Sequence, residues 1–93
     1  TVDFAKALTF LKQAASQGHP RAFYNLGVAH KEGKGLEPDL VEAYKWFHLA
    51  AEMGHKEAME ERKGLVQKLG SQEIMEALRR SFRFQSSKDK KLQ

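Results

Sequence analysis

The chain contains no cysteine, which excludes disulfide bonds, cysteine-ligated zinc or iron–sulfur sites and thiol catalysis. It has only two prolines in 93 residues, and no apolar run approaches the roughly 20 residues that a membrane-spanning helix needs. An excess of one charge is also missing over most of its length: residues 1–70 carry ten basic and nine acidic side chains, and residues 71–93 carry six and three. This composition predicts a small, soluble, mostly helical domain with a basic end.

The two ends of the chain carry little targeting information. The first four residues lack the charged and then apolar order of a signal peptide, so we expect neither a signal peptide nor a transmembrane segment, and the cellular compartment stays open. A start at Thr1 is consistent with a processed or excised piece. Residues 85–93 are polar and lysine-rich, and we expect a disordered basic tail there.

An internal repeat dominates the sequence. At an offset of 36, seven of the twenty positions from 3 to 22 are identical to their counterparts, among them Gly18 with Gly54. Periods of this length, close to the roughly 34 residues of tetratricopeptide units, are typical of stacked helical hairpins. The sequence therefore predicts an all-α solenoid domain over residues 1–84, with repeats at about 3–38 and 39–70.

Local signals predict five helices. Asp39 has the position of an N-cap, and Glu42 completes the spacing of a capping box by which it would reach back to the Asp39 N–H. Gly54 ends that helix, because glycine adopts a positive φ without steric cost. The expected helices cover residues 3–18, 20–32, 39–54, 56–69 and 71–84, with Ser71 capping the fifth.

The apolar residues predict how these helices pack. Gly27 costs about 1 kcal/mol relative to alanine inside a helix, so we expect a neighbouring backbone to pass too close there for any side chain. The last helix is expected to cap the array through one apolar stripe. The residues expected in the core or the capping stripe are Phe10, Trp46, Phe47, Ile74, Ala77, Leu78 and Phe82.

A named family matches these patterns. Residues 22–35 and 43–55 contain an aromatic pair before Ala-Ala-x-x-Gly-His, then Ala-x-x-x-Leu-Gly, then Gly-x-Gly. They resemble the Sel-1-like repeat, an α/α-hairpin unit related to the tetratricopeptide repeat, and residues 61–84 are similar to the closing segment of bacterial arrays of this family. The resemblance implies a bacterial, right-handed α/α superhelical solenoid that serves as an adaptor and has no shared cofactor.

The second repeat departs from the pattern at one place. The pair Arg62-Lys63 stands where the first repeat has Leu-Gly, so we expect the array to end there and the fifth helix to act as its cap. The N-terminal face has no comparable cap. Further repeats upstream and a homodimer contact through Phe4 and Leu8 are both open.

No motif assembles a catalytic site, a nucleotide loop or a metal site, so we predict no enzyme activity, no metal and no cofactor. His48 and Glu52 lie four residues apart on one helical face, but two ligands without a third are more often a surface pair. The arginines and lysines of residues 79–91 suit a solvated helix end better than a nucleic-acid site.

We predict a non-enzymatic scaffold that binds a protein or peptide on the concave face lined by the first helix of each hairpin. The alternative is a small ligand or a cell-wall substrate, with a weak possibility of an enzyme, in a groove near His48 and Glu52. The outward positions of the predicted concave face are Thr9, Lys12, Ser16, Lys45, His48 and Glu52.

Overall fold

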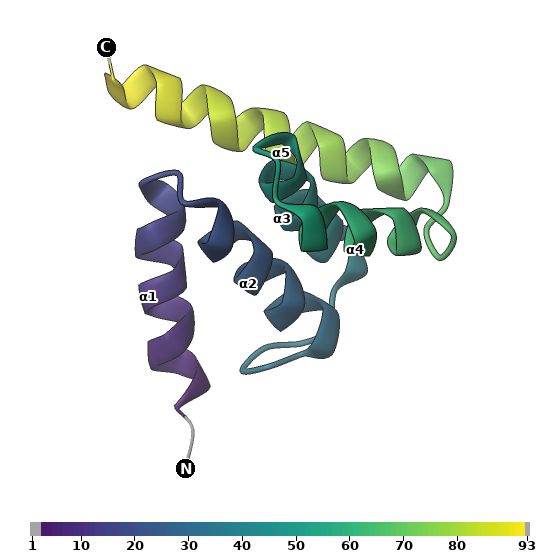
Figure 1. Ribbon diagram of the computed structural model, residues 1–93, viewed down its shortest axis with the longest axis horizontal. Helices are drawn as coiled ribbons and strands as arrows, with labels where there is room; N and C mark the ends of the chain where they lie inside the picture. Colours follow the sequence, from purple (N-terminus) through teal and green to yellow (C-terminus); the bar gives the residue numbers. More distant parts are fainter. Residues whose placement is uncertain (1–2, 93) are drawn as a thin grey trace.

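Five α-helices and no strand make up the part of the chain described by a computed structural model, which covers the backbone of residues 3–92 and the side chains of residues 3–87. This confirms the all-α class. The first four helices form two hairpins, and the fifth lies across the second hairpin (Figure 1). The helices are α1 Phe4–Ser16, α2 Pro20–Glu32, α3 Leu40–Glu52, α4 Lys56–Val66 and α5 Ser71–Leu92.

The start of α3 follows only half of the predicted capping box. Asp39 Oδ1 accepts hydrogen bonds from the second and third N–H groups of α3 at 3.0 and 3.1 Å, as Asp3 does for one N–H group of α1. The reciprocal bond does not form, because the Asp39 N–H donates to the His30 carbonyl at 2.8 Å. The Glu42 carboxylate instead accepts from Arg80 of α5 at 2.9 Å. The cap therefore also ties α3 to α2, while Glu42 ties it to α5.

Helix α4 ends at Val66, earlier than the predicted end at Leu69. The carbonyls of Gly64 and Leu65 accept hydrogen bonds from N–H groups at 67 to 69, which closes a tight turn. This turn directs Leu69 into the core, where it is buried. The apolar character of Leu69 therefore reflects burial in the turn and not a further helical turn.

Helix α5 differs from its prediction at both ends. Gly70, not Ser71, holds the cap position, since its carbonyl accepts from the first bonded N–H of α5 and its own N–H donates to Glu73 Oε1 at 2.9 Å. The helix continues to Leu92, although an end at Phe84 and a disordered tail were expected. No glycine or proline follows Gly70, so nothing in the sequence interrupts the backbone ladder. Residues 1–2 of the predicted domain and residue 93 of the predicted tail lie outside the described residues.

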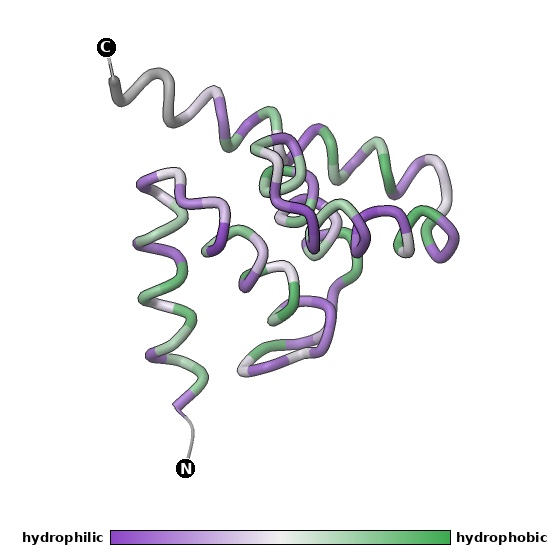
Figure 2. Tube along the Cα trace, in the orientation of Figure 1, coloured by the Kyte–Doolittle hydropathy of each residue, from purple (hydrophilic) through white to green (hydrophobic). Residues whose placement is uncertain are grey.

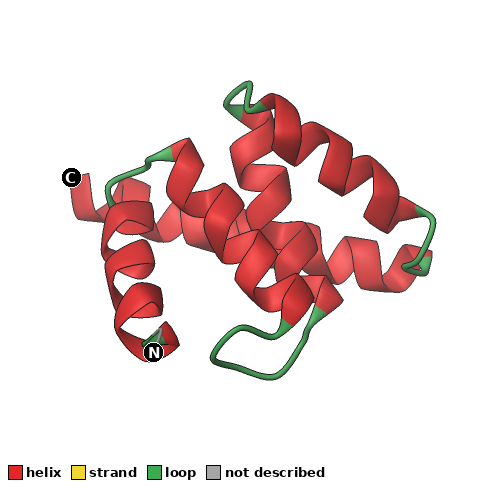
Figure 3. Cartoon of the chain, turned by 60° about the horizontal axis from the view of Figure 1, so that its bottom comes forward, coloured by secondary structure: helices red, strands yellow, loops and turns green. Residues whose placement is uncertain are grey.

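The core lies mainly between α2 and α3, the most closely packed pair of helices. The connection between them is the most extended loop of the chain (Figure 3). A Cβ atom added at Gly27 would lie 2.6 Å from the ring of Phe47, which is fully buried. The expectation that a backbone excludes a side chain at Gly27 is therefore wrong, because the neighbour is an aromatic ring.

Helix α5 packs on α3 through small residues and one aromatic ring. Ala77 and Ser81 are buried, and the half-buried ring of Phe84 meets Trp46 and Phe23 edge to face at centroid distances of 5.2 and 5.7 Å. Two ridges of α5 have helical spacing, and only this one turns inward. Helix α2 packs most closely on its neighbour in the sequence, α3. Helix α5 instead makes its principal contact with α3, two helices earlier in the chain, and not with its neighbour α4.

The other ridge of α5 faces away from the core, contrary to the prediction for Leu78 and Phe82. Met75 is 57% exposed, Leu78 37% and Phe82 73%, and these three residues are called the outer stripe below. Figure 2 shows apolar positions recurring along α5 between polar ones. Both ridges recur at three- and four-residue steps, so periodicity alone does not tell which one is buried.

Phe10 is 70% exposed and does not belong to the core, contrary to the prediction. Its counterpart in the repeat, Trp46, is buried because Phe23 stacks on it and Phe84 of α5 covers it. Among the described residues, no helix covers α1 as α5 covers α3. Equivalent positions of the repeat thus have different environments.

Replacing Gly27 by alanine should destabilise the protein. The Phe47 ring would have to move, at about 1–3 kcal/mol, and this outweighs the roughly 1 kcal/mol gained from helix propensity. Gly64→Ala is the matched control, since nothing lies within 4 Å of a Cβ atom there, and it should be neutral or stabilising. Urea unfolding followed by circular dichroism tests both, and a Gly27→Ala variant that is as stabilised as Gly64→Ala would contradict the packing described.

Phe84→Ala should lower the free energy of unfolding by about 1–2 kcal/mol, because full burial of a phenylalanine is worth about 1.5–3 kcal/mol and Phe84 is half-buried. Phe82→Ala should change it by no more than about 0.5 kcal/mol. The fluorescence of Trp46, the only tryptophan, should shift in the folded Phe84 variant alone. Equal effects of the two substitutions would show that the inward ridge is wrongly assigned.

Candidate protein-binding face

The α1 part of the predicted concave face is open to solvent. Thr9, Lys12 and Ser16 are all exposed. The Thr9 hydroxyl donates to the Ala5 carbonyl at 3.1 Å and the Ser16 hydroxyl to the Gln13 carbonyl at 2.6 Å. Both hydroxyl oxygens keep lone pairs with which to accept a hydrogen bond, and Lys12 adds a donor.

Lys45 does not lie on an open face. Its side chain is only 14% exposed, because Nζ lies 4.1 Å from the centroid of the Trp46 ring and 5.8 Å from that of Phe84, and it also bonds Glu42 at 3.5 Å. Burying the stem while the charged end reaches a carboxylate is usual for lysine. The ammonium group helps to hold α5 on α3, and α5 covers it from any partner that approaches this face.

His48 and Glu52 are brought together as predicted, with a third residue between them. Arg62 of α4 donates through its Nη1 to His48 Nδ1 at 2.9 Å and to Glu52 Oε2 at 3.2 Å. Because a guanidinium has donors only, Nδ1 accepts and the neutral imidazole carries its proton on Nε2. Arg62 replaces Leu26 of the first repeat, and this exchange of an apolar for a charged residue was the signal available in the sequence.

Burial sets the charge of two histidines. Partial burial lowers the pKa of His48, the Arg62 guanidinium lowers it further, and Glu52 opposes both. Burial also lowers the pKa of His30, where the carboxylates of Glu42 and Asp39 oppose it. Both imidazoles are therefore neutral near pH 7.

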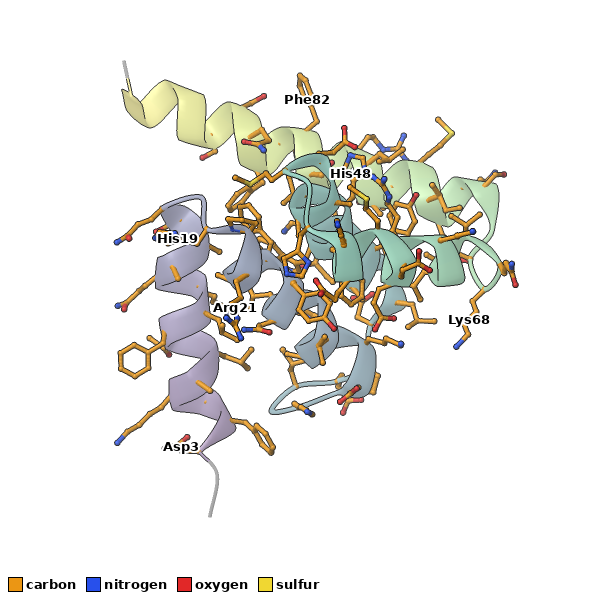
Figure 4. All side chains as sticks on the ribbon, viewed as in Figure 1. Asp3, His19, Arg21, His48, Lys68 and Phe82 are labelled. Atoms are coloured by element: carbon orange, nitrogen blue, oxygen red, sulfur yellow. The ribbon has the colours of Figure 1, made fainter. Side chains whose placement is uncertain are left out.

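A groove of about 380 Å³ runs beside the contact between α3 and α5. Figure 4 shows His48 beside the place where α3 meets α5, and Phe82 projecting outward from α5. The groove is lined by His48, Leu49, Glu52, Leu78, Ser81, Phe82 and Gln85.

The six predicted residues do not form one continuous surface. Helix α1 packs on α2 and stands apart from α3 in Figure 1, and the two are not a closely packed pair. The α1 residues are open, whereas the α3 residues lie at or beneath α5. At the N-terminal end, Phe4 is exposed but Leu8 is largely buried, and both line a hollow of about 230 Å³ beside α2.

The described side chains include no group of three His, Asp or Glu residues placed to share a metal ion. Between residues 3 and 92, no helix has the length and hydropathy to cross a membrane. Of the described residues that line the groove, Glu52 is the one that carries a charge, and it is paired with Arg62, while much of the remaining lining is apolar.

Paired hairpins that repeat their caps, turns and small residues define a helical-repeat protein of the α/α-hairpin type. The family model of the Sel1 repeat matches residues 1–19 and 20–55, so the chain belongs to the Sel1 repeat family. The second matched segment contains α2 and α3, the two helices with the closest packing. Sel1 repeats generally mediate protein–protein interactions, and their family is generally non-enzymatic.

Curated relatives align with about 60% of the length of this chain. The mouse DAP3-binding cell death enhancer 1 is 36% identical over 59 residues, and the fission yeast chitin synthase regulatory factor 3 is 37% identical over 57. These segments are 63% and 61% of this chain but only 12% and 6% of the relatives. Both names describe binding or regulation. The relatives are eukaryotic, so the expected bacterial source has no support from them.

Stability should fall as the pH drops below about 6.5, the ordinary histidine pKa. The folded chain holds His30 and His48 neutral, so the unfolded chain binds protons first as the pH drops. This proton binding stabilises the unfolded state relative to the folded one. Above about pH 7 both histidines are neutral in the folded and the unfolded chain, so their titration no longer lowers the stability of the folded state. Urea unfolding at about pH 7 and 5 should show a smaller difference for the His30→Gln/His48→Gln variant than for the unaltered chain. An unchanged difference would rule out this assignment.

Proposed function

We propose that the chain is a non-enzymatic adaptor that binds a protein or peptide partner through those residues of the predicted concave face that stay open, on α1 and at the rim of the groove beside α5. The observation that carries this proposal is the exposed polar row Thr9, Lys12 and Ser16 on the first helix of a Sel1 hairpin. These side chains contribute nothing to the core, and together they offer one cationic donor and two hydroxyl acceptors at regular spacing. A repeat presents such groups at fixed intervals to an extended partner.

The second hairpin contributes differently. His48 offers its Nε2–H and Glu52, which is 62% exposed, offers a carboxylate at the rim of the groove. Lys45 lies under α5 and acts as a positioning residue, since it links Glu42, Trp46 and Phe84. A partner would thus contact α1 along its length and α3 only beside α5.

A small polar ligand in the groove near His48 and Glu52 has less support. Arg62 already occupies the space between them and bonds both, so an ionic ligand would have to displace a formed ion pair. For a cell-wall substrate, the same pairing leaves His48 Nδ1 engaged by Arg62 and not free to act as a base. Ligand-induced thermal stabilisation that His48→Ala abolishes would favour this alternative.

A charge-swapped variant tests the proposed face. Lys12→Glu combined with Glu52→Lys reverses both charges and leaves the net charge unchanged. We expect partners captured by the unaltered chain to bind this variant about tenfold or more weakly, the effect of 1.4 kcal/mol. DAP3 is a suitable first probe, because the name of the mouse relative states that it binds DAP3.

Lys68→Glu combined with Glu60→Lys is the matched control, since both side chains are exposed and lie outside the proposed face. It should retain the captured partners, which are quantified by mass spectrometry after capture from a cell extract. Equal retention by all three proteins would refute the proposed face. Failure of the unaltered chain to retain any protein specifically would refute the adaptor function itself.

A further inference from the structure

The outer stripe of α5 is an apolar surface that the chain leaves uncovered. Met75, Leu78 and Phe82 follow one another at three- and four-residue steps over two helical turns, and Phe82, at 73%, is the most exposed large apolar side chain described. Two arginines, Arg79 and Arg83, lie along one flank and line the same hollow of about 380 Å³. Apolar anchors at this spacing are what helix–groove recognition uses.

This surface is held in place by the opposite side of the same helix. Phe84 packs edge to face against the stacked rings of Trp46 and Phe23, and Arg80 bonds both Glu42 and Glu76 at 2.9 and 2.8 Å. A fixed helix exposes its outer face without the cost of ordering it on binding, which favours a specific contact.

Phe82 forms a ridge between two hollows. One contains Met75, Arg79 and Arg83, and the other is the groove of about 380 Å³ toward His48. A binding partner needs side chains that enter hollows on both sides of a ridge, as packed helices do when ridges fit into grooves. A lipid surface has no such side chains, and Glu52 at the groove rim would face its anionic headgroups.

The charges select the partner. Arg79 and Arg83 are both exposed: Arg79 pairs with Glu76 at 3.2 Å and keeps 59% of its side chain exposed, and among the described side chains Arg83 forms no ion pair. A second copy packed antiparallel would bring the same flank of both copies together, and the Glu76 carboxylate on that flank already bonds Arg79 and Arg80. In a parallel pair Arg79 and Arg83 would face the groove side, where the carboxylate of Glu52 is already bound by Arg62. Neither arrangement supplies free carboxylates.

We propose that the outer stripe is a docking site for an acidic amphipathic helix of a protein partner. Its apolar side chains would pack on Met75, Leu78 and Phe82, and its carboxylates would pair with Arg79 and Arg83. Arginine forms bidentate contacts with carboxylates, which fixes the register of the bound helix. This surface is separate from the α1 row of the proposed adaptor face.

Two synthetic helical peptides of about five turns, roughly 18 residues, test the proposal. Both carry leucine at three- and four-residue steps, one with glutamate and the other with lysine along one flank. We expect the glutamate peptide to bind the 93-residue chain about tenfold or more tightly, as measured by calorimetry. Arg79→Glu/Arg83→Glu should reverse this preference, and Phe82→Ala should abolish binding. Lys12→Glu should leave binding unchanged, which separates this site from the adaptor face.

Phe10→Ala is the matched control, because Phe10 is equally exposed but lies on α1. Equal affinity for the two peptides, no binding up to about 1 mM, or equal loss with Phe10→Ala and Phe82→Ala would overturn the proposal. It would also be overturned if phosphatidylserine vesicles bound in a Phe82-dependent way while neither peptide did, which would indicate a membrane. A dimer in sedimentation that Phe82→Ala dissociates would likewise overturn it in favour of a second copy.

Discussion

The approach of α2 to α3 depends on the Phe47 ring lying against Gly27. No other residue at position 27 leaves room for a fully buried aromatic ring, so this contact sets the separation of the two helices that form most of the core. Trp46, the next residue along α3, then stacks on Phe23 of α2. That stack is the platform on which Phe84 and the whole of α5 rest. One glycine thus determines where the last helix can lie.

Much of the fold follows from short-range rules that the sequence displays. Asp3 and Asp39 accept hydrogen bonds from N–H groups of the helices that follow them. Gly18 and Gly54 take the positive φ angles expected after the first helix of each hairpin. These signals depend on neighbours within four residues. The repeat offset then supplied the pairing of helices, because identical positions in two units require the same local structure. The first four helices were predictable for this reason.

The position of α5 was not predictable in the same way. Its two ridges have the same period, and hydropathy favours burying Leu78 and Phe82 over Ala77 and Ser81. The small residues are inside because α5 approaches α3 closely, and close approach depends on contacts far away in the sequence. For the same reason the binding face was predicted only in part. Lys45 has the spacing of an exposed residue but is covered by a helix that the repeat does not contain.

The contact between Phe23 and Phe84 has a consequence for the order of folding. Nearly two thirds of the chain separates these residues, whereas the pairs α1–α2, α2–α3 and α3–α4 join neighbours in the sequence. Closing a long loop costs more chain entropy than closing a short one, so local hairpins form early and distant contacts late. Helix α5 should therefore dock last and detach first. The carboxyl-terminal quarter of the protein would then be a separate cooperative unit, whose opening exposes Trp46 before the hairpins unfold.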